Sequence, residues 1–581
     1  MRPEDAFALM VDQGDMVLDR LDACCRVHPD KTFIIYGEDD ITLSFAAFRQ
    51  ATDRLAAGLA RLGVGADDRV SVFTRNSLVA ALAMFAIWRA GGVYAPINFN
   101  FKGQLLGYQL KDTAPKLLIT DINMAGVLAE LADDLALPPV MMHHPRPGDH
   151  DDAGTTMPLA GLGGAPLHDL ADLLATDAAP PVVIRRYGDI ANIVYTSGTT
   201  GPSKGVMQSF RWMNQYNFLL RSLNNADDVL YCDLPLYHVG GAFSQFVRAV
   251  WHGCTVGLWD RFSPNRFWRR IDRCGATVCV LLDVMVPWLM SAEPDTRDRE
   301  NTLNKVHMQP LPTAHHQVAR RFGFDFTTAG FGQTESGAGF LVVIDQFGAE
   351  AGTPPDLYRG LSKDALRTAV RDMNLYMVDG AAPTPKGLMG RPSPLLETAV
   401  LDPEDNICPP GVVGQLAFRS RFPSTILTGY LNKPEKTLEA FRNQWFHTGD
   451  AISRDADGIH YFVDRMGGFF RVRGENVSSF EVEDLINSHP SIRVAAALPV
   501  PAREGGEEDI GVFVELVEGA TLSLDALRAH CAAVMPRYMV PHHLRIIDAL
   551  PLTPTGKIEK YKLRQQLLAE IEAAASGRLS A

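Results

Sequence analysis

The sequence predicts an α/β protein with a large N-terminal domain of parallel-rich sheets and helices and a small, mobile α+β C-terminal domain. Three observations support this prediction. The 581 residues are too many for one hydrophobic core. In the first half of the chain, short apolar runs alternate with longer helical patterns, as in βαβ units. Near the end, about 110 residues contain strand and helix patterns of their own, enough for a separate compact unit.

The first elements alternate regularly. Residues 41–63 carry leucines at helical spacing behind Ser44, a residue type that caps helix N-termini, so they predict an amphipathic helix. Residues 69–74 and 116–120 predict strands on either side of a buried helix over 77–92, which ends in glycine. Strands separated by a helix pair in parallel, so a parallel sheet is expected here.

The later elements are predicted by the same patterns. Strands are expected at 226–241 (followed by a turn), 253–260, 276–282 and 414–420, with a helix near 264–274. Residues 133–185 and 345–390 are expected to be irregular, apart from a helix at 361–378. Two β-rich runs over 459–475 surround Gly467–Gly468, a favourable place for a hinge. The last unit is expected to contain strands at 494–500, 510–517 and 544–547, a helix at 522–535, and a final loop and helix.

Composition excludes several classes of function. The chain is 46% hydrophobic and 21% charged, with a net charge of −13, which argues against nucleic acid or an anionic membrane surface as a main partner. The eight cysteines form no CxxC or Cys/His cluster, so they predict reduced thiols in a cytoplasmic protein and no zinc site. No run of 18 apolar residues predicts a transmembrane segment, and the first residues are too charged for a signal peptide.

The stretch "YTSGTTGPSKG" at 195–205 predicts a phosphate-binding loop. Its glycines, Gly198, Gly201 and Gly205, are expected to adopt positive φ and turn backbone N–H groups towards an anion. Hydroxyls and one ammonium group add donors around it. The spacing fails the Walker pattern, because Ser203 precedes Lys204 and Gly205 follows it. A flexible turn without a ligand remains the alternative on composition alone.

Three further motifs follow in order: "GFGQTES" at 330–336, "WFHTGD" at 445–450 and "PTGKIEK" at 554–560. Together with the first loop, they resemble the adenylate-forming superfamily of acyl-CoA synthetases, adenylation domains and luciferases, over residues 40 to 565. The segment 464–490 and "RFSPNRFWRRI" at 261–271 resemble crotonobetaine/carnitine-type CoA ligases, and 464–490 also resembles fatty-acid-transport-type ligases. The resemblance implies an N-terminal AMP-binding domain over 1–463 and a mobile C-terminal domain over 464–581 that swings about Asp464.

The resemblance also implies roles for the nucleotide site. The phosphates of ATP would be held by Thr196, Ser197, Gly198, Thr199, Thr200, Gly201 and Lys204. The nucleotide would further contact Phe331, Gly332, Gln333, Thr334, Asp450 and Arg465. Phe331 would stack on adenine, and Thr334 would reach the α-phosphate. Asp450 would accept hydrogen bonds from the ribose hydroxyls, and Arg465 would reach ribose or phosphate oxygens. Mg²⁺ would be bound through Thr196 and Glu335, since it prefers oxygen ligands.

Lys557 is the predicted catalytic residue, beside Thr334 and Glu335. A substrate carboxylate and the α-phosphate repel each other, and a cation between them offsets that repulsion. No protein base is needed, because the carboxylate is already ionised at pH 7. The residues alone leave structural alternatives open: a core phenylalanine at Phe331, a turn acid at Glu335, a helix cap at Asp450, an interdomain ion pair at Arg465, and a basic loop at Lys557.

Coenzyme A and the acyl group are assigned by the same resemblance. Rotation of the C-terminal domain would carry Lys557 away and bring the coenzyme A contacts to the site, at Arg471, Arg473, Gly474 and Glu475. Gly467–Gly468 replace the lysine and acid usual after the hinge arginine, a departure that bears on these contacts. The acyl pocket is assigned to His238, Gly240, Gly241 and Gly337, whose glycines leave room for a bulky or branched acyl group. A core histidine is the alternative for His238.

The predicted function is an ATP-dependent carboxylic acid–CoA ligase that forms an acyl-adenylate and then an acyl-CoA, releasing pyrophosphate and AMP. Its expected ligands are a small carboxylic acid, ATP, Mg²⁺ and coenzyme A, and relatives of this kind also form homodimers. Two alternatives stay open: acyl transfer to a carrier-protein thiol, and fatty-acid uptake. The failed Walker spacing argues against a kinase.

Overall fold

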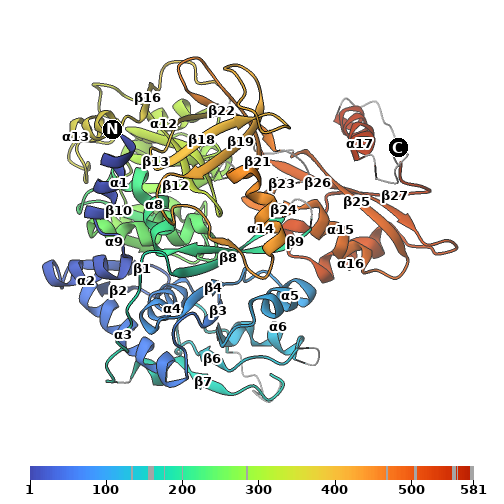
Figure 1. Cartoon of the computed structure of the whole chain (residues 1–581), viewed down its shortest axis with the longest axis horizontal. Helices are drawn as coiled ribbons and strands as arrows, with labels where there is room; N and C mark the ends of the chain where they lie inside the picture. Colours follow the sequence, from blue (N-terminus) through green and yellow to red (C-terminus); the bar gives the residue numbers. More distant parts are fainter. Residues whose placement is uncertain are drawn as a thin grey trace.

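A computed structural model shows how the chain folds. It describes residues 1–132, 135–154, 162–175, 177–198, 201–282, 285–385, 387–465, 469–502, 507–551, 558 and 560–575. At 197–198, 201–202, 464–465, 469, 476, 478, 480, 561 and 574–575 it describes the backbone alone. The N-terminal part forms a broad body, and the C-terminal part, coloured orange to red in Figure 1, extends to one side of it.

The phosphate-loop candidate belongs to a sheet of eight strands at the lower half of Figure 1. Neighbouring strands β4, β3, β5, β6 and β7 pair in parallel, as the alternation of strands and helices predicts. In spatial order the strands are β20 (Gly429–Tyr430), β9 (Gly201–Ser209), β8 (Ile190–Gly198), β4 (Val93–Pro96), β3 (Arg69–Phe73), β5 (Leu117–Asp121), β6 (Val140–His143) and β7 (Leu167–Asp169).

A second, 14-stranded sheet carries the other motifs of the N-terminal part. Its central strands from β1 to β14 pair in parallel, and those from β14 to β18 pair antiparallel. In spatial order they are β18 (Leu396–Leu401), β19 (Gly414–Ser420), β21 (Phe446–Arg454), β22 (His460–Arg465), β17 (Leu388–Pro392), β15 (Gly337–Asp345), β14 (Phe326–Gln333), β13 (Lys305–Gln309), β12 (Val278–Leu282), β10 (Val229–Cys232), β11 (Thr255–Leu258), β1 (Thr32–Tyr36) and β2 (Ile41–Ser44), with β16 (Tyr376–Asp379) beside β15.

Helices cover these sheets, and the largest core lies around α4, which is apolar on all sides and buried. The α-helices of this part are α1 (Pro3–Asp12), α2 (Val17–Val27), α3 (Phe45–Arg61), α4 (Ser77–Ala90), α5 (Gly103–Thr113), α6 (Ala125–Ala129), α7 (Leu170–Leu174), α8 (Phe210–Arg221), α9 (Arg248–His252), α10 (Phe267–Cys274), α11 (Met285–Met290), α12 (His315–Phe322), α13 (Lys363–Asp372) and α14 (Pro434–Ala440). A π-helix, η3 (Gly240–Val247), runs directly into α9. Short 3₁₀ turns are η1 (Ile122–Met124), η4 (Thr296–Arg299), η5 (Arg442–Gln444) and, in the C-terminal part, η6 (Arg537–Met539).

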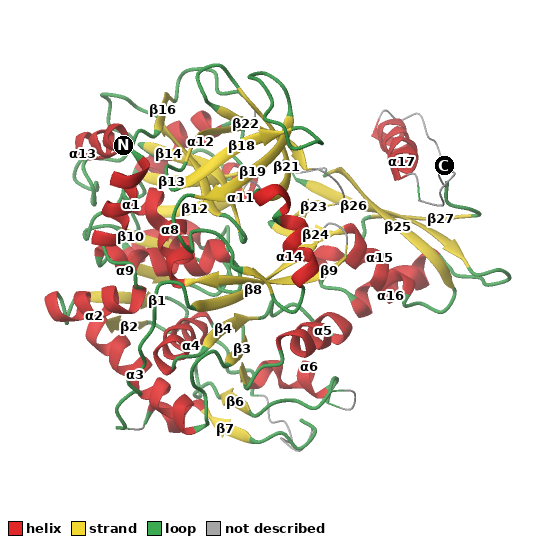
Figure 2. Ribbon diagram, viewed as in Figure 1, coloured by secondary structure: helices red, strands yellow, loops and turns green. Residues whose placement is uncertain are grey.

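The C-terminal part has its own sheets and core. Its strands are β23 (Phe469–Val472), β24 (Glu475–Ser478), β25 (Ile492–Pro501), β26 (Glu508–Leu516) and β27 (His543–Ile547). Its helices are α15 (Ser479–Asn487), α16 (Leu524–Val534) and α17 (Lys560–Ala575), the last near the C-terminus at the upper right of Figure 2. Sheet membership changes between β22, which pairs with β21, and β23, which pairs with β24. The domain boundary at Asp464 stays a prediction.

Most predicted elements are present at the expected places. Ser44 caps α3 by accepting a hydrogen bond from the Ala47 N–H at 3.1 Å, and Gly91 ends α4 in the left-handed conformation. The irregular range 133–185 was a partly wrong prediction, because it contains β6, β7 and α7. These strands span four residues or fewer and β6 is bordered by prolines, so their local signal is weak. The range 345–390 likewise contains β16 and the start of β17 as well as the predicted helix.

A histidine clamp fixes part of this excursion to the body. The His150 imidazole lies 2.8 Å from Asp39 Oδ2 and 2.7 Å from Asp260 Oδ2. Burial opposes the charge on His150, but the hydrogen bonds and charges of Asp260 and Asp39 outweigh it and raise the pKa to about 9. Asp39, His150 and Asp151 bring potential metal ligands within 4.8 Å of one another. A protonated imidazole has no free lone pair, so an ion-pair clamp explains the cluster.

The clamp predicts a pH-dependent stability. Because the pKa of His150 is raised in the folded state, its stabilisation is complete below the ordinary value near 6.5 and is lost as pH rises through about 9. The full effect amounts to at most about 3 kcal/mol. We expect the melting temperature of the wild type to fall more between pH 6.5 and 9 than that of His150→Gln. His144→Gln, in the same segment, is the control and should behave like the wild type; equal slopes for all three would contradict the clamp.

Candidate functional site

The stretch 195–205 forms a hairpin between β8 and β9, in which Thr196 faces Lys204. Thr199 and Thr200 lie outside the described residues, and only the backbone of Ser197, Gly198 and Gly201 is described. The prediction for Gly205 was wrong: it lies in extended β9 without a positive φ. A Cβ there would lie 2.8 Å from Cγ2 of Ile193, so close side-chain packing is the reason for this glycine.

Glu335 is the centre at which separate segments meet. The Thr196 hydroxyl donates to Glu335 Oε1 at 3.3 Å, and the Tyr430 hydroxyl donates to the same oxygen at 3.2 Å. The Glu335 carbonyl accepts hydrogen bonds from Trp212 Nε1 at 3.1 Å and from the Leu427 N–H at 2.8 Å. These bonds hold the carboxylate beside the first loop, and Glu335 itself lies in the turn between β14 and β15.

Lys204 provides the cation of this site. Its Nζ lies 4.4 Å from the centre of the Tyr430 ring, a cation–π contact. Burial lowers the pKa of Lys204, and the charge of Glu335 acts in the opposite direction. An ammonium group held between a ring and a carboxylate is well placed to receive a further anion.

The motif that contains Asp450 contacts the motif that contains Glu335 through Gln333. Its Nε2 donates to Asp450 Oδ2 at 2.5 Å and to the Thr448 carbonyl at 3.1 Å. Asp450 is 2% exposed and faces Arg465 across the β21–β22 pair. It lies inside β21, so it is not a helix cap. The Arg465 side chain is outside the described residues.

Phe331 and Thr334 complete the motif at the end of β14. The Phe331 ring is half-buried, with its centre 6.2 Å from that of Phe340 and 6.3 Å from that of Phe418. It therefore packs at the edge of a core while keeping exposed surface. The Thr334 carbonyl accepts a hydrogen bond from Gln208 Nε2 at 2.8 Å. Their contacts with adenine and the α-phosphate stay predictions.

The C-terminal part docks onto this region through Glu475. Its carboxylate accepts a hydrogen bond from the Tyr237 hydroxyl at 3.1 Å and lies 2.6 Å from His238 Nε2. Burial would raise the pKa of Glu475, but the charge and hydrogen bond of His238 and the bond from Tyr237 lower it below its ordinary value. The His238 side chain is 41% exposed, so it is not a core histidine.

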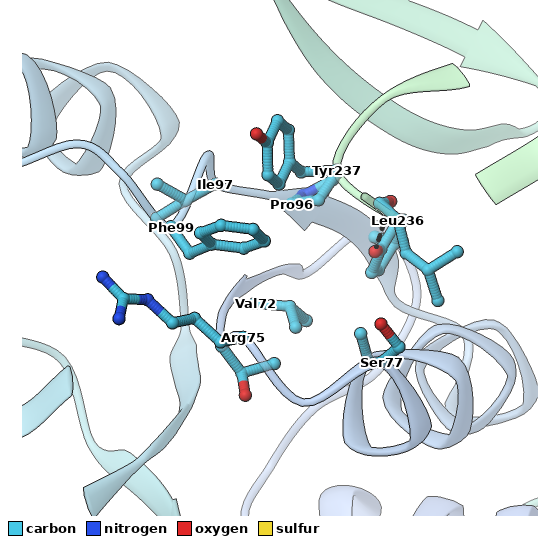
Figure 3. A pocket seen from close by; sticks show the side chains of 11 residues that line it. Val72, Arg75, Ser77, Pro96, Ile97, Phe99, Leu236 and Tyr237 are labelled. Atoms are coloured by element: carbon cyan, nitrogen blue, oxygen red, sulfur yellow. Dashed lines mark hydrogen bonds between the residues drawn. The ribbon is translucent and has the colours of Figure 1, made fainter. Parts of the chain in front are cut away.

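Neighbouring side chains hold Tyr237 in place. Its ring meets Phe99 edge-on at 5.0 Å, above a cavity of about 10 Å³ whose lining is drawn in Figure 3. The Tyr94 hydroxyl donates to the Leu236 carbonyl at 3.1 Å in this lining. The cavity has room for about one water molecule. Tyr237 is thereby fixed where it receives Glu475.

The predicted coenzyme A residues lie on the turn that carries Glu475. Gly474 has φ +83°, and a Cβ there would lie 2.8 Å from Leu282 Cδ1. The passage of a pantetheine chain along this backbone stays a prediction. The Gly474 N–H donates to Glu507. Arg471 Nε lies 3.6 Å from Glu507 Oε1, and exposed Arg473 contacts His542 at 3.0 Å.

Two of the glycines assigned to the acyl pocket, Gly241 and Gly337, are required by close packing and not by the predicted space for an acyl group. A Cβ on Gly241 would lie 2.4 Å from the Pro235 carbonyl oxygen, and one on Gly337 would lie 2.0 Å from Gln215 Oε1. Gly337 also has φ +70°. Protein atoms occupy the space at both positions, so these glycines do not make room for a bulky acyl group. Gly240, at the start of η3, keeps nearly open space.

Lys557 lies outside the described residues. Its neighbour Ile558 packs against the core cluster around Leu498 and Phe513, and Lys560 Nζ lies 2.6 Å from Glu483 Oε1. The role of Lys557 therefore stays a prediction.

Sequence reasoning missed several residues of the site. Tyr430 and Trp212 support Glu335, and neither lies in the motifs that were recognised. The range 226–241 predicted only a strand and a turn, whereas a π-helix begins at Gly240. A π-helix has no strong local signal and often occurs at functional sites.

Two known family patterns match this chain. The sequence pattern of the AMP-binding enzyme family matches residues 21–431, and that of the AMP-binding enzyme C-terminal domain matches residues 481–557. The chain is 28% identical to the sulfoacetate–CoA ligase of Cupriavidus necator over 94% of its length and 98% of the relative. It is 25% identical to the crotonobetaine/carnitine–CoA ligase of Proteus mirabilis, again over 94% and 98%.

Solved structures share the fold. The o-succinylbenzoate CoA synthetase of Bacillus subtilis has a TM-score of 0.72 at 21% identity, covering 94% of this chain and 97% of the other. The amide bond synthetase of Marinactinospora thermotolerans has a TM-score of 0.72 at 22% identity, covering 95% and 99%. In the described residues, no helix is long and apolar enough to cross a membrane. The chain therefore belongs to the AMP-binding enzyme family, within the adenylate-forming superfamily that its motifs predicted.

Proposed function

We propose that this chain is an AMP-forming carboxylic acid–CoA ligase. The observation that carries the proposal is the assembly of motifs at one place: the first loop contacts Glu335 through Thr196, and Gln333 contacts Asp450. The names of the relatives, sulfoacetate–CoA ligase and crotonobetaine/carnitine–CoA ligase, support the same reaction. They activate different acids, so the comparison leaves the acid of this chain open.

In the first step, a carboxylate oxygen of the substrate attacks the α-phosphorus of ATP. A new P–O bond forms, the bond to pyrophosphate breaks, and pyrophosphate leaves with its electron pair. Lys204 and the loop N–H groups would bind the leaving phosphates, and Thr334 and Lys557 would stabilise charge at the reacting phosphate. Asp450 would orient the ribose, so that the α-phosphate faces the acid.

The oxygen groups around Glu335 fit a magnesium ion. Thr196 Oγ1 and Glu335 Oε1 lie 3.3 Å apart, and both are hard oxygen donors of the kind that Mg²⁺ prefers. Bound there beside the phosphates, the ion would neutralise charge on the departing pyrophosphate. The residues alone hold the carboxylate in place through Tyr430.

In the second step, the sulfur of coenzyme A attacks the acyl carbon. A thioester bond forms, the acyl–oxygen bond breaks, and AMP leaves. The docked turn at Gly474 and Glu475 supports this assignment, because it meets His238 next to the nucleotide motifs. In its neutral form, His238 would accept the thiol proton at the ring nitrogen that does not face Glu475, and the Glu475 carboxylate would stabilise the imidazolium that forms.

Replacing Asp450 should weaken ATP binding. A carboxylate accepts two ribose hydroxyls, and hydrogen bonds to a charged group are stronger than neutral ones. We expect Asp450→Ala to raise the Kd for ATP at least about tenfold, and Asp450→Asn, which keeps one acceptor oxygen, to raise it less. Isothermal titration with ATP measures both values. An unchanged Kd in Asp450→Ala would remove Asp450 from the ribose site.

Replacing Lys557 should stop only the first step. We expect Lys557→Ala to bind ATP but to release no pyrophosphate, because the cation between two anions is missing. When supplied with a preformed acyl-adenylate and coenzyme A, the variant should form thioester at nearly the wild-type rate. If thioester output from the adenylate falls as far as the overall reaction, the proposed role is wrong.

Replacing Gly474 should slow only the second step, the formation of the thioester. A side chain at φ +83° is strained and would press on Leu282, so the docked turn is destabilised. We expect Gly474→Ala to slow thioester formation from the adenylate at least about tenfold while leaving pyrophosphate release unchanged. Gly519→Ala is the matched control, since it has φ +78° with open space around it. Equal losses in both half-reactions would argue against a docking role.

The two alternative functions are distinguished by the acceptor. A carrier-loading enzyme would release AMP only when a carrier protein is added, whereas the proposed ligase needs free coenzyme A alone. Measuring AMP with and without coenzyme A separates them. An uptake protein would be recovered with the membrane fraction, and formation of ADP in place of AMP would indicate a kinase.

A further inference from the structure

Among the described residues, Arg248 is a buried cation without a counter-ion. It begins α9 directly after the π-helix η3 and is 3% exposed. Its Nε is buried without a hydrogen-bond partner, and within the described residues the guanidinium forms no hydrogen bond or ion pair. Burial lowers the pKa of Arg248 to about 10, so it remains protonated at neutral pH. Leaving a charge in this state is costly unless something pairs with it.

The nearest acid is already committed. Asp228 acts on Arg248 electrostatically, but its Oδ1 lies 2.8 Å from Lys305 Nζ and accepts a hydrogen bond from Thr277 at 2.6 Å. Its Oδ2 accepts from the Asn225 N–H at 2.9 Å. Lys305 thus balances the charge of Asp228, so Asp228 does not neutralise the charge of Arg248.

A second polar side chain is also left without partners. Gln245 lies three residues before Arg248 and is 1% exposed, and in the described part of the chain neither its Nε2 nor its Oε1 has a hydrogen-bond partner. Buried amide groups are hydrogen-bonded in nearly all proteins, so such an exception needs an explanation. Two buried donors without partners, on the consecutive helices η3 and α9, indicate that a polar ligand binds here. Because one of these donors is a guanidinium, the ligand is expected to be an anion.

Arg248 is connected to the nucleotide motif through Tyr216. The charge of Arg248 acts on Tyr216 and on His307, and both of these side chains are half-buried. A Cβ on Gly332 would lie 3.7 Å from Cε2 of Tyr216. The Tyr216 ring stacks on Trp212 at 5.0 Å, and Trp212 bonds to the Glu335 carbonyl. The charge of Arg248 thus acts on a side chain, Tyr216, that also lies next to Gly332 of the nucleotide motif.

His307 adds no competing charge. Burial, together with the nearby charge of Arg248, lowers the pKa of His307 to about 4, so the imidazole is neutral at pH 7. Its Nδ1 lies 3.0 Å from the Thr328 hydroxyl. The neutral ring adds no second cation next to Arg248, so the guanidinium supplies the positive charge at this place.

We propose that the substrate is a carboxylic acid with a second anionic group, carboxylate or sulfonate, and that Arg248 binds this second group with help from Gln245. This inference rests on the proposed ligase function and names its substrate class. One end of the acid reacts at the α-phosphate, while the other end is held by the guanidinium. A monocarboxylic acid of the same length would leave Arg248 unpaired and would therefore be rejected.

The test compares acids in wild type and Arg248→Met, which keeps the volume but removes the charge. Straight-chain dicarboxylic acids, ω-sulfonic acids and monocarboxylic acids of matched length are assayed by pyrophosphate release. We expect the wild type to prefer an anionic acid over its matched monocarboxylic acid by about 100-fold or more in kcat/KM. Arg248→Met should lose this preference, and Arg248→Lys should retain part of it. The two anionic series tell carboxylate from sulfonate.

Melting temperatures give an independent readout without ATP. Removing an unpaired buried charge should not lower the melting temperature of the ligand-free protein, and an anionic acid should raise that of the wild type but not that of Arg248→Met. Arg221→Met is the matched control: Arg221 is equally buried but bonds to Gln13 and Asn214, so its loss should lower the melting temperature.

The outcomes separate the two proposals. Release of AMP with a preference that does not depend on Arg248 overturns the anion site and keeps the ligase. A shift in melting temperature that depends on Arg248, without AMP from any acid, overturns the ligase and keeps the anion site. Equal use of matched monocarboxylic and anionic acids by the wild type, or a shift produced equally by inorganic phosphate, overturns the assignment of Arg248 to the substrate.

Discussion

The contact between Glu475 and the pair of Tyr237 and His238 is a charged contact that joins the C-terminal part to the N-terminal part, beside hydrogen bonds such as that from Asn98 to the Tyr538 hydroxyl. An ionised carboxylate withdrawn from water needs partners, and here both come from the N-terminal part. The Tyr237 ring is itself held against Phe99, so the receiving surface is rigid. Docking therefore selects a single turn, centred on Gly474, whose positive φ no other residue adopts without strain.

The nucleotide site depends on a different kind of constraint. Its acids come from separate strands of the large sheet, and its first loop comes from the other sheet. Hydrogen bonds from Thr196 and Tyr430 to Glu335 connect these sheets where they meet. Charge is concentrated there, with Lys204 beside Glu335 and Gln333 on Asp450. Such an arrangement suits a ligand that is itself highly charged, because each group gains a partner when it binds.

Arg248 is the opposite case, because its buried charge is not paired within the described part of the protein. The paired charges in the protein, such as Lys305 with Asp228, stabilise the fold whether or not a ligand is bound. An unpaired buried guanidinium destabilises the free protein, and such a cost is retained where function requires it. The π-helix that precedes Arg248 is consistent with this interpretation, because it changes which residues face the sheet.

The sequence by itself determined the class of the fold, most helices and strands, and the family. These follow from local signals: the cap at Ser44, the terminating glycine at 91, and motifs whose residue types suit phosphate and carboxylate chemistry. Only the tertiary structure decided that protein atoms pack closely against Gly205, Gly241 and Gly337, that Tyr430 supports Glu335, and that Arg248 Nε has no hydrogen-bond partner among the described residues. Contacts of this kind depend on the register and packing of segments far apart in the chain, and no local pattern encodes them.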